Sequence, residues 1–117
     1  MTEIEDLTSR IREFAAARSW ERFHTPKNLA MALAGEAGEL LAELQWLTDE
    51  EVAAALSEED ARDRVRMEAA DVFMYLLRFA DVTGIDLAQA TLDKMARNEL
   101  RYPVDKSRGK STKHDRL

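Results

Sequence analysis

Two helical stretches of the chain each carry a pair of acidic residues three positions apart. The first pair is Glu36 and Glu39, the second is Glu68 and Asp71, and both are set among Ala, Leu, Met and Val. Residues three apart lie on one face of a helix, so each pair directs two carboxylates the same way. Gathering acids away from water is unfavourable, because repulsion and desolvation both oppose ionisation. The chain must fold so that these faces either reach water or share a bound cation.

Acidic residues on the wet face of an amphipathic helix are common, so a single Glu-x-x-Glu would carry little weight. Two pairs in apolar surroundings favour a metal site instead. Carboxylates without histidine or thiolate ligands suit a hard cation. A di-iron bundle would use Glu-x-x-His pairs, and neither His24 nor His114 lies in that setting. We therefore predict that the four carboxylates bind Mg²⁺, with Mn²⁺ as the alternative.

Composition and capping residues predict an all-α fold. The 117 residues include two prolines and four glycines, with abundant Ala, Leu, Glu and Arg and no alternating Val/Ile/Thr run. Capping patterns predict helix starts at Thr2, Thr25, Thr48, Ser57 and Asp86. The second helix is expected to run to about Leu47, the long fourth helix to stop at Gly84, and the last helix to end at Pro103. Residues 1–103 are thus expected to form one domain.

Charge is distributed unevenly along the chain. The formal net charge is −6, but residues 105–117 hold five basic and two acidic residues, a net +3, which leaves −9 on the rest. An acidic body argues against a nucleic-acid partner. The basic tail, residues 104–117, is predicted to be mobile; closure over an anionic ligand is the alternative.

The chain has no feature of a secreted or membrane protein. It contains no cysteine, its N-terminus lacks the basic and then apolar run of a signal peptide, and no apolar stretch approaches the ~20 residues that span a membrane. We predict a cytoplasmic protein without a membrane partner.

Gly35 and Gly38 flank the first acidic pair inside a predicted helix. Each glycine costs roughly 1 kcal/mol relative to alanine at such a position. A helix with two of them is expected to let a ligand or another backbone come close, and packing against a partner helix is the simpler version of this interpretation.

Basic and amide side chains share one face of the last predicted helix. Lys94, Asn98 and Arg101 follow one another at i, i+4 and i+7. Such donors suit the oxygens of a polyphosphate, although basic residues near a helix C-terminus are favoured by the macrodipole in any case. Beside a carboxylate-held Mg²⁺, this face is a candidate triphosphate clamp.

Aromatic residues provide candidates for base recognition. Trp20, Phe23 and His24 lie in a non-helical connection, and Trp46 lies near the end of the second helix. Flat rings beside a pocket can stack on a nucleobase, whereas packing at the edge of the core is the alternative. Tyr75 follows Asp71 by four residues, so it either lines the same site or is a core tyrosine.

These residues together resemble the MazG-like superfamily of all-α nucleoside triphosphate pyrophosphohydrolases. The two acidic pairs match its Glu-x-x-Glu and Glu-x-x-Asp signature. Further segments resemble its dCTP pyrophosphatase branch: Phe14–His24, Gly35–Glu39, Gln45–Trp46, Lys94–Asn98 and Arg101–Pro103.

The resemblance implies a four-helix-bundle-like fold that assembles as a dimer or as a dimer of dimers. It also implies Mg²⁺-dependent cleavage of dCTP, or of modified dCTP, between the α- and β-phosphates. The four carboxylates would then form the catalytic metal centre. The base and sugar would be enclosed by Trp20, Phe23, His24, Trp46 and Tyr75. The phosphates would be met by Lys94, Asn98 and Arg101.

Two alternatives remain at this point. Animal members of the branch have a histidine where this chain has Ile11, so a house-cleaning pyrophosphohydrolase of broader or non-cytosine specificity is the nearer one. The other is a non-catalytic helical module for oligomerisation or interaction, in which the four acids would be solvated and replaceable.

Overall fold

A computed structural model describes all residues from Met1 to Leu117, and its regular elements are all helices. In chain order they are α1 (Glu3–Ala17), the 3₁₀ helix η1 (Glu21–Phe23), α2 (Pro26–Ala42), α3 (Asp49–Leu56), α4 (Glu59–Thr83), α5 (Leu87–Arg101), α6 (Val104–Ser107) and the 3₁₀ helix η2 (His114–Arg116). The predicted all-α class is confirmed. The chain divides into two compact units, Met1–Gly84 and Ile85–Leu117, which are described separately.

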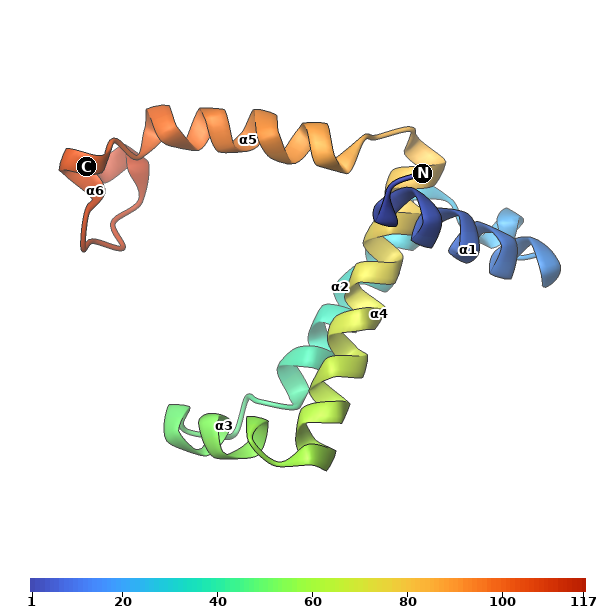
Figure 1. Cartoon of the computed structure of the whole chain (residues 1–117), viewed down its shortest axis with the longest axis horizontal. Helices are drawn as coiled ribbons and strands as arrows, with labels where there is room; N and C mark the ends of the chain where they lie inside the picture. Colours follow the sequence, from blue (N-terminus) through green and yellow to red (C-terminus); the bar gives the residue numbers. More distant parts are fainter. The chain divides into compact units, whose positions relative to one another are not determined.

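In the N-terminal unit, the long helix α4 packs against α1, α2 and α3 (Figure 1). Helix α2 runs antiparallel to α4. Arg78 contacts His24 before the start of α2, and Arg64 pairs with Glu43 just after its end, with an N–O distance of 3.5 Å. The core of this unit is small, because Leu29 and Leu77 are the only large side chains that are fully buried.

Local capping explains where most of the helices begin. Thr2 and Thr48 each form a capping box with the glutamate three residues on. Thr25 accepts from the backbone N–H of N3, and a proline occupies the first helical position. Asp86 caps α5, and Gly84 ends α4 in the left-handed conformation at φ 71°. These predictions from sequence are confirmed.

Two predicted helix limits are wrong. Helix α2 ends at Ala42 and not near Leu47, because the chain turns there: the backbone N–H of Leu44 donates to Leu41 O at 2.9 Å, an i to i+3 bond that tightens the last turn. Ser57 does not cap α4. Its hydroxyl donates to Ala54 O at 2.7 Å at the end of α3, and Glu58 stands at the N-cap of α4 without a side-chain cap.

The C-terminal unit contains α5, α6 and η2. Within it, the ring of Tyr102 meets that of His114 edge to face, with centroids 5.8 Å apart. The segment predicted as a basic tail therefore includes two short helices, and its mobility stays a prediction. No helix in either unit is long and apolar enough to cross a membrane.

Candidate metal and nucleotide site

Three of the four predicted carboxylates converge between α2 and α4. Glu36 on α2 and Glu68 and Asp71 on α4 each offer an oxygen, and these oxygens lie within 4.8 Å of one another. All three side chains are half-buried. They meet because each helix directs its acids along one face and the two helices pack side by side. Glu39, one turn after Glu36, is exposed and lies outside this closest group.

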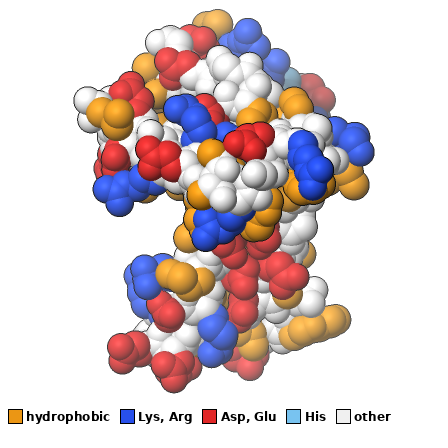
Figure 2. Space-filling model, turned by 90° about the vertical axis from the view of Figure 1, so that its right-hand side faces the viewer, with side chains coloured by type: hydrophobic (Ala, Val, Ile, Leu, Met, Phe, Trp, Pro, Cys, Tyr) orange, Lys and Arg blue, Asp and Glu red, His pale blue; other side chains and the backbone are white.

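Glu36, Glu68 and Asp71 form the carboxylate group of this site, and their charges repel one another when no cation is present. Partial burial raises the pKa of Glu68, and the charges of Asp71, Glu39, Glu36 and Glu43 raise it further. Acidic side chains gather along the paired helices in the space-filling view (Figure 2). A donor set made only of carboxylate oxygens fits a hard divalent cation, which would remove this repulsion.

The glycines beside this group face open space. Apart from its sequence neighbours and the backbone of its own helix, a Cβ added at Gly35 or at Gly38 would meet nothing within 4 Å. The close approach expected at these glycines is therefore not made by another helix of the N-terminal unit.

Three predicted base-binding residues gather around η1, before α2. The ring of Trp20 meets the ring of His24 edge to face at 6.3 Å and that of Phe14 at 5.8 Å. Phe23 is half exposed, with the Arg22 guanidinium 4.6 Å from its ring centre. The structure thus forms a partly exposed aromatic group at the N-terminal end of α2.

The two remaining aromatic candidates lie elsewhere in the N-terminal unit. Tyr75 is half-buried on α4, about one turn beyond Asp71. Trp46 is 86% exposed and follows the far end of α2. Because α2 has 17 residues, it spans roughly 25 Å. Within one chain, Trp46 therefore lies far from the aromatic group around η1.

The predicted phosphate-binding residues all lie on α5, in the C-terminal unit. Lys94 and Arg101 are exposed, and Asn98 is half-buried. Their shared helical face agrees with the spacing in the sequence, and their role stays a prediction.

Sequence reasoning missed a network that joins α1, α4 and the connection before α2. The buried Arg78 donates from Nε to His24 Nδ1 and from Nη1 to Asp81 Oδ2, both at 2.9 Å. Asp81 also accepts two bonds from Arg12, at 2.6 and 2.9 Å. One signal was available: Arg78 interrupts an otherwise apolar run from Val72 to Ala80.

This network lowers two pKa values. The hydrogen bond from Arg12 lowers the pKa of Asp81, which partial burial opposes and the charges of Arg12 and Arg78 reinforce. Partial burial lowers the pKa of His24, and the nearby Arg78 lowers it further against the opposing effect of Glu21. Asp81 is thus held ionised and His24 neutral.

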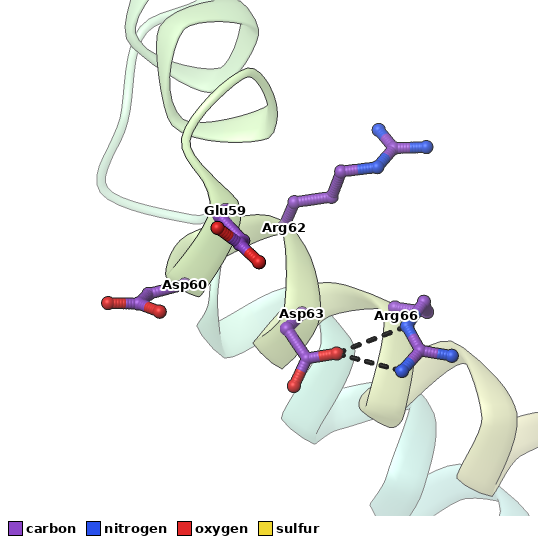
Figure 3. Close-up of a pocket in the computed structure, with 5 residues that line it drawn as sticks. All are labelled: Glu59, Asp60, Arg62, Asp63 and Arg66. Carbon is purple, nitrogen blue, oxygen red and sulfur yellow. Dashed lines mark hydrogen bonds and ion pairs between the residues drawn. The ribbon is translucent and has the colours of Figure 1, made fainter.

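A separate depression of about 490 Å³ lies along the first two turns of α4 (Figure 3). Five charged side chains of that one helix line it: Glu59, Asp60, Arg62, Asp63 and Arg66. Arg66 donates to Asp63 Oδ1 from Nε at 3.1 Å and from Nη2 at 2.9 Å. None of these residues belongs to the predicted site, so we interpret the depression as a solvated charged surface.

Comparison with known proteins gives concordant matches. A model of the MazG-like family matches residues 32–117. The chain is 43% identical to dCTP pyrophosphatase 1 of Bos taurus over 114 residues, which is 97% of this chain and 68% of that protein. It is 41% identical to dCTP pyrophosphatase 1 of Homo sapiens, over 97% of this chain and 67% of that protein. The crystal structure of a pyrophosphatase from Archaeoglobus fulgidus matches with a TM-score of 0.82 and 39% identity, covering 88% of this chain and 94% of that one.

Proposed function

The chain belongs to the MazG-like family, and on this premise we propose that it is a metal-dependent nucleoside triphosphate pyrophosphohydrolase that converts dCTP to dCMP and pyrophosphate. The observation that carries this proposal is the convergence of Glu36, Glu68 and Asp71 within 4.8 Å in a chain 43% identical to a dCTP pyrophosphatase. The choice of dCTP rests on the relatives alone, and the choice of a metal-dependent reaction also rests on the donor set.

The carboxylate group is the part of the chain that would hold the cation. Glu36, Glu68 and Asp71 would bind Mg²⁺, with Mn²⁺ as the alternative that the same oxygen donors accept. The chemistry that such a cation supplies is neutralisation of phosphate charge and activation of water. Glu39 lies on the same helix as Glu36 but outside the closest group, so it is the carboxylate left to accept a proton as general base.

The aromatic group would hold the nucleoside. Trp20 and Phe23 are partly exposed and can stack on a base or a sugar, and His24 lies against Trp20. Tyr75 stands on α4 between Asp71 and Arg78, so its ring can line the space between the carboxylates and the aromatic group. The phosphate-binding role of Lys94, Asn98 and Arg101 remains part of the proposal.

A second copy of the chain is proposed as a partner. Only Leu29 and Leu77 are fully buried large side chains, whereas Met31, Leu41 and Leu92 are each at least 59% exposed. A chain of this size rarely leaves so much apolar surface in water unless another surface covers it. We propose a homodimer or homotetramer, in which Trp46 can reach a site from which the length of α2 separates it within its own chain. Molar mass from light scattering tests this directly.

Release of pyrophosphate from a nucleotide panel tests the proposed activity. The panel contains the four canonical deoxynucleoside triphosphates and 5-methyl-dCTP, each with Mg²⁺ and with EDTA. We expect release from dCTP and 5-methyl-dCTP that EDTA abolishes. Asp71→Asn should abolish the release, whereas Asp63→Asn, the same change on an exposed part of α4, should not. Equal rates on all bases would support the broader house-cleaning activity, and a panel without turnover would support the interaction module.

A further inference from the structure

Arg78 is the one charged residue of the chain that is buried, at 6% exposure, and it lies outside the carboxylate group. Its guanidinium joins two side chains. Nη1 donates to Asp81 and Nε donates to His24 Nδ1, each at 2.9 Å. Asp81 is held in turn by Arg12 from α1. The orientation of Arg78 is therefore fixed from one side by an ion pair, while the other side faces an imidazole.

The chemistry of this contact selects one form of the imidazole. A guanidinium N–H can only donate, so His24 Nδ1 must present its lone pair. The imidazolium and the tautomer with a proton on Nδ1 would both set an N–H against an N–H. Only the neutral ring with its proton on Nε2 satisfies the contact. The lowered pKa of His24 also favours the neutral ring.

The remaining nitrogen of His24 is free to act on another molecule. Nε2 makes no hydrogen bond within the chain, and it is not buried. Beside it, Trp20 is 42% exposed. Arg78 follows Asp71 by seven residues on one face of α4, which is about 10 Å along the helix. A nucleoside whose phosphates meet the carboxylates can span that distance.

We propose that Arg78 is a positioning residue that fixes His24 as the neutral tautomer protonated on Nε2, so that His24 donates a hydrogen bond to an acceptor on the nucleoside part of the substrate. The substrate half of this inference rests on the proposed function, whereas the tautomer does not. The charged groups that face the imidazole are Arg78, with Asp81 and Arg12 behind it, and Glu21 from η1.

Nitrogen-15 NMR of the imidazole tests the tautomer in the full-length protein. The chain has two histidines, so His114→Gln assigns the signals. We expect His24 to show a protonated Nε2 and an unprotonated Nδ1 at pH 7.5 and to titrate below the ordinary histidine value. In Arg78→Met, we expect a mixture of tautomers and a titration that moves up toward the ordinary value. Arg12→Met, which alters Asp81 without touching His24, should leave the tautomer unchanged.

Each spectrum decides the question. A wild-type His24 with its proton on Nδ1, or a charged ring at pH 7.5, would overturn the proposal without any variant. An unchanged His24 spectrum in a folded Arg78→Met protein would overturn it as well. In Arg78→Lys, one informative result is a His24 that titrates as in the wild-type protein and still shows a mixture of tautomers. That result would show that the directed Nε–H of Arg78, and not its charge alone, selects the tautomer.

Kinetics test the contact with substrate. Loss of one hydrogen bond should raise the KM for dCTP about threefold to tenfold in His24→Gln, with a smaller change in kcat. Arg78→Met should act in the same direction, and the double variant should be no worse than His24→Gln. Additive effects would overturn the claim that Arg78 acts through His24. If the wild-type protein hydrolyses no nucleotide, the proposed function and the substrate half fail together, while the NMR result still decides the tautomer.

Discussion

The ion pairs around Asp81 lead to a stability prediction whose size follows from burial. Asp81→Asn removes the carboxylate that Arg12 and Arg78 share. The side chain of Arg78 is 7% exposed and that of Arg12 is 55% exposed, so only Arg78 loses its anion away from water. Breaking a buried pair costs about 3–5 kcal/mol, and an exposed pair contributes about 0–1 kcal/mol. Because Asp81 itself keeps 14% exposure, we expect a loss at the lower end, about 3 kcal/mol.

Urea denaturation followed by circular dichroism measures this loss. All variants must be compared at one chain concentration, because assembly adds to the apparent stability. Arg12→Met is the matched control, and because the Arg12 side chain is exposed it should cost clearly less than Asp81→Asn. Replacing both members of the buried pair, with Asp81→Leu and Arg78→Met, should recover most of the loss, since no buried charge is then left alone. Equal, small effects of Asp81→Asn and Arg12→Met would refute the reasoning from burial.

Three further predictions follow from the same geometry. Glu68→Gln should raise the melting temperature in EDTA, because it removes a charge whose partial burial and repulsion by neighbouring carboxylates raise the pKa of Glu68. It should also abolish the rise in melting temperature on adding Mg²⁺; a retained Mg²⁺ response would contradict the site. His24 and Asp81 both have lowered pKa values, so at these two residues the folded chain binds fewer protons than the unfolded chain. Urea midpoints should fall as the pH drops below about 6.5, through His24, and again below about 4, through Asp81, and His24→Asn should remove the upper step only. Leu77→Ala, at a side chain that is 1% exposed, should cost about 2–5 kcal/mol in urea denaturation; a cost below 1 kcal/mol would mean that the site relaxes.

Helix starts were predictable because capping is local. Thr2, Thr25 and Asp86 satisfy backbone N–H groups within three residues, so a short stretch of sequence contains the whole interaction. The errors fall where a local alternative replaces the expected bond. Leu44 N–H donates to Leu41 O and ends α2 early, and the hydroxyl of Ser57 donates back to Ala54 O in place of capping α4.

The candidate site was likewise predictable from sequence only in part. The convergence of Glu36, Glu68 and Asp71 follows from a three-residue spacing on two apolar helices, which must pack together. The Arg78 network did not follow from sequence, because it requires knowing which residue of α1 meets the end of α4. The position of Trp46 depends on the early end of α2, which sequence reasoning placed about five residues too late.

Identification of the products of dCTP by phosphorus-31 NMR tests the central claim most directly. With Mg²⁺, the account predicts dCMP and pyrophosphate in equal amounts from the wild-type protein, and none from Glu36→Gln, which loses one of the three converging carboxylates. Products of dCDP and orthophosphate, or turnover that survives Glu36→Gln, would contradict the assignment of this carboxylate group as the site of α,β-phosphoanhydride hydrolysis.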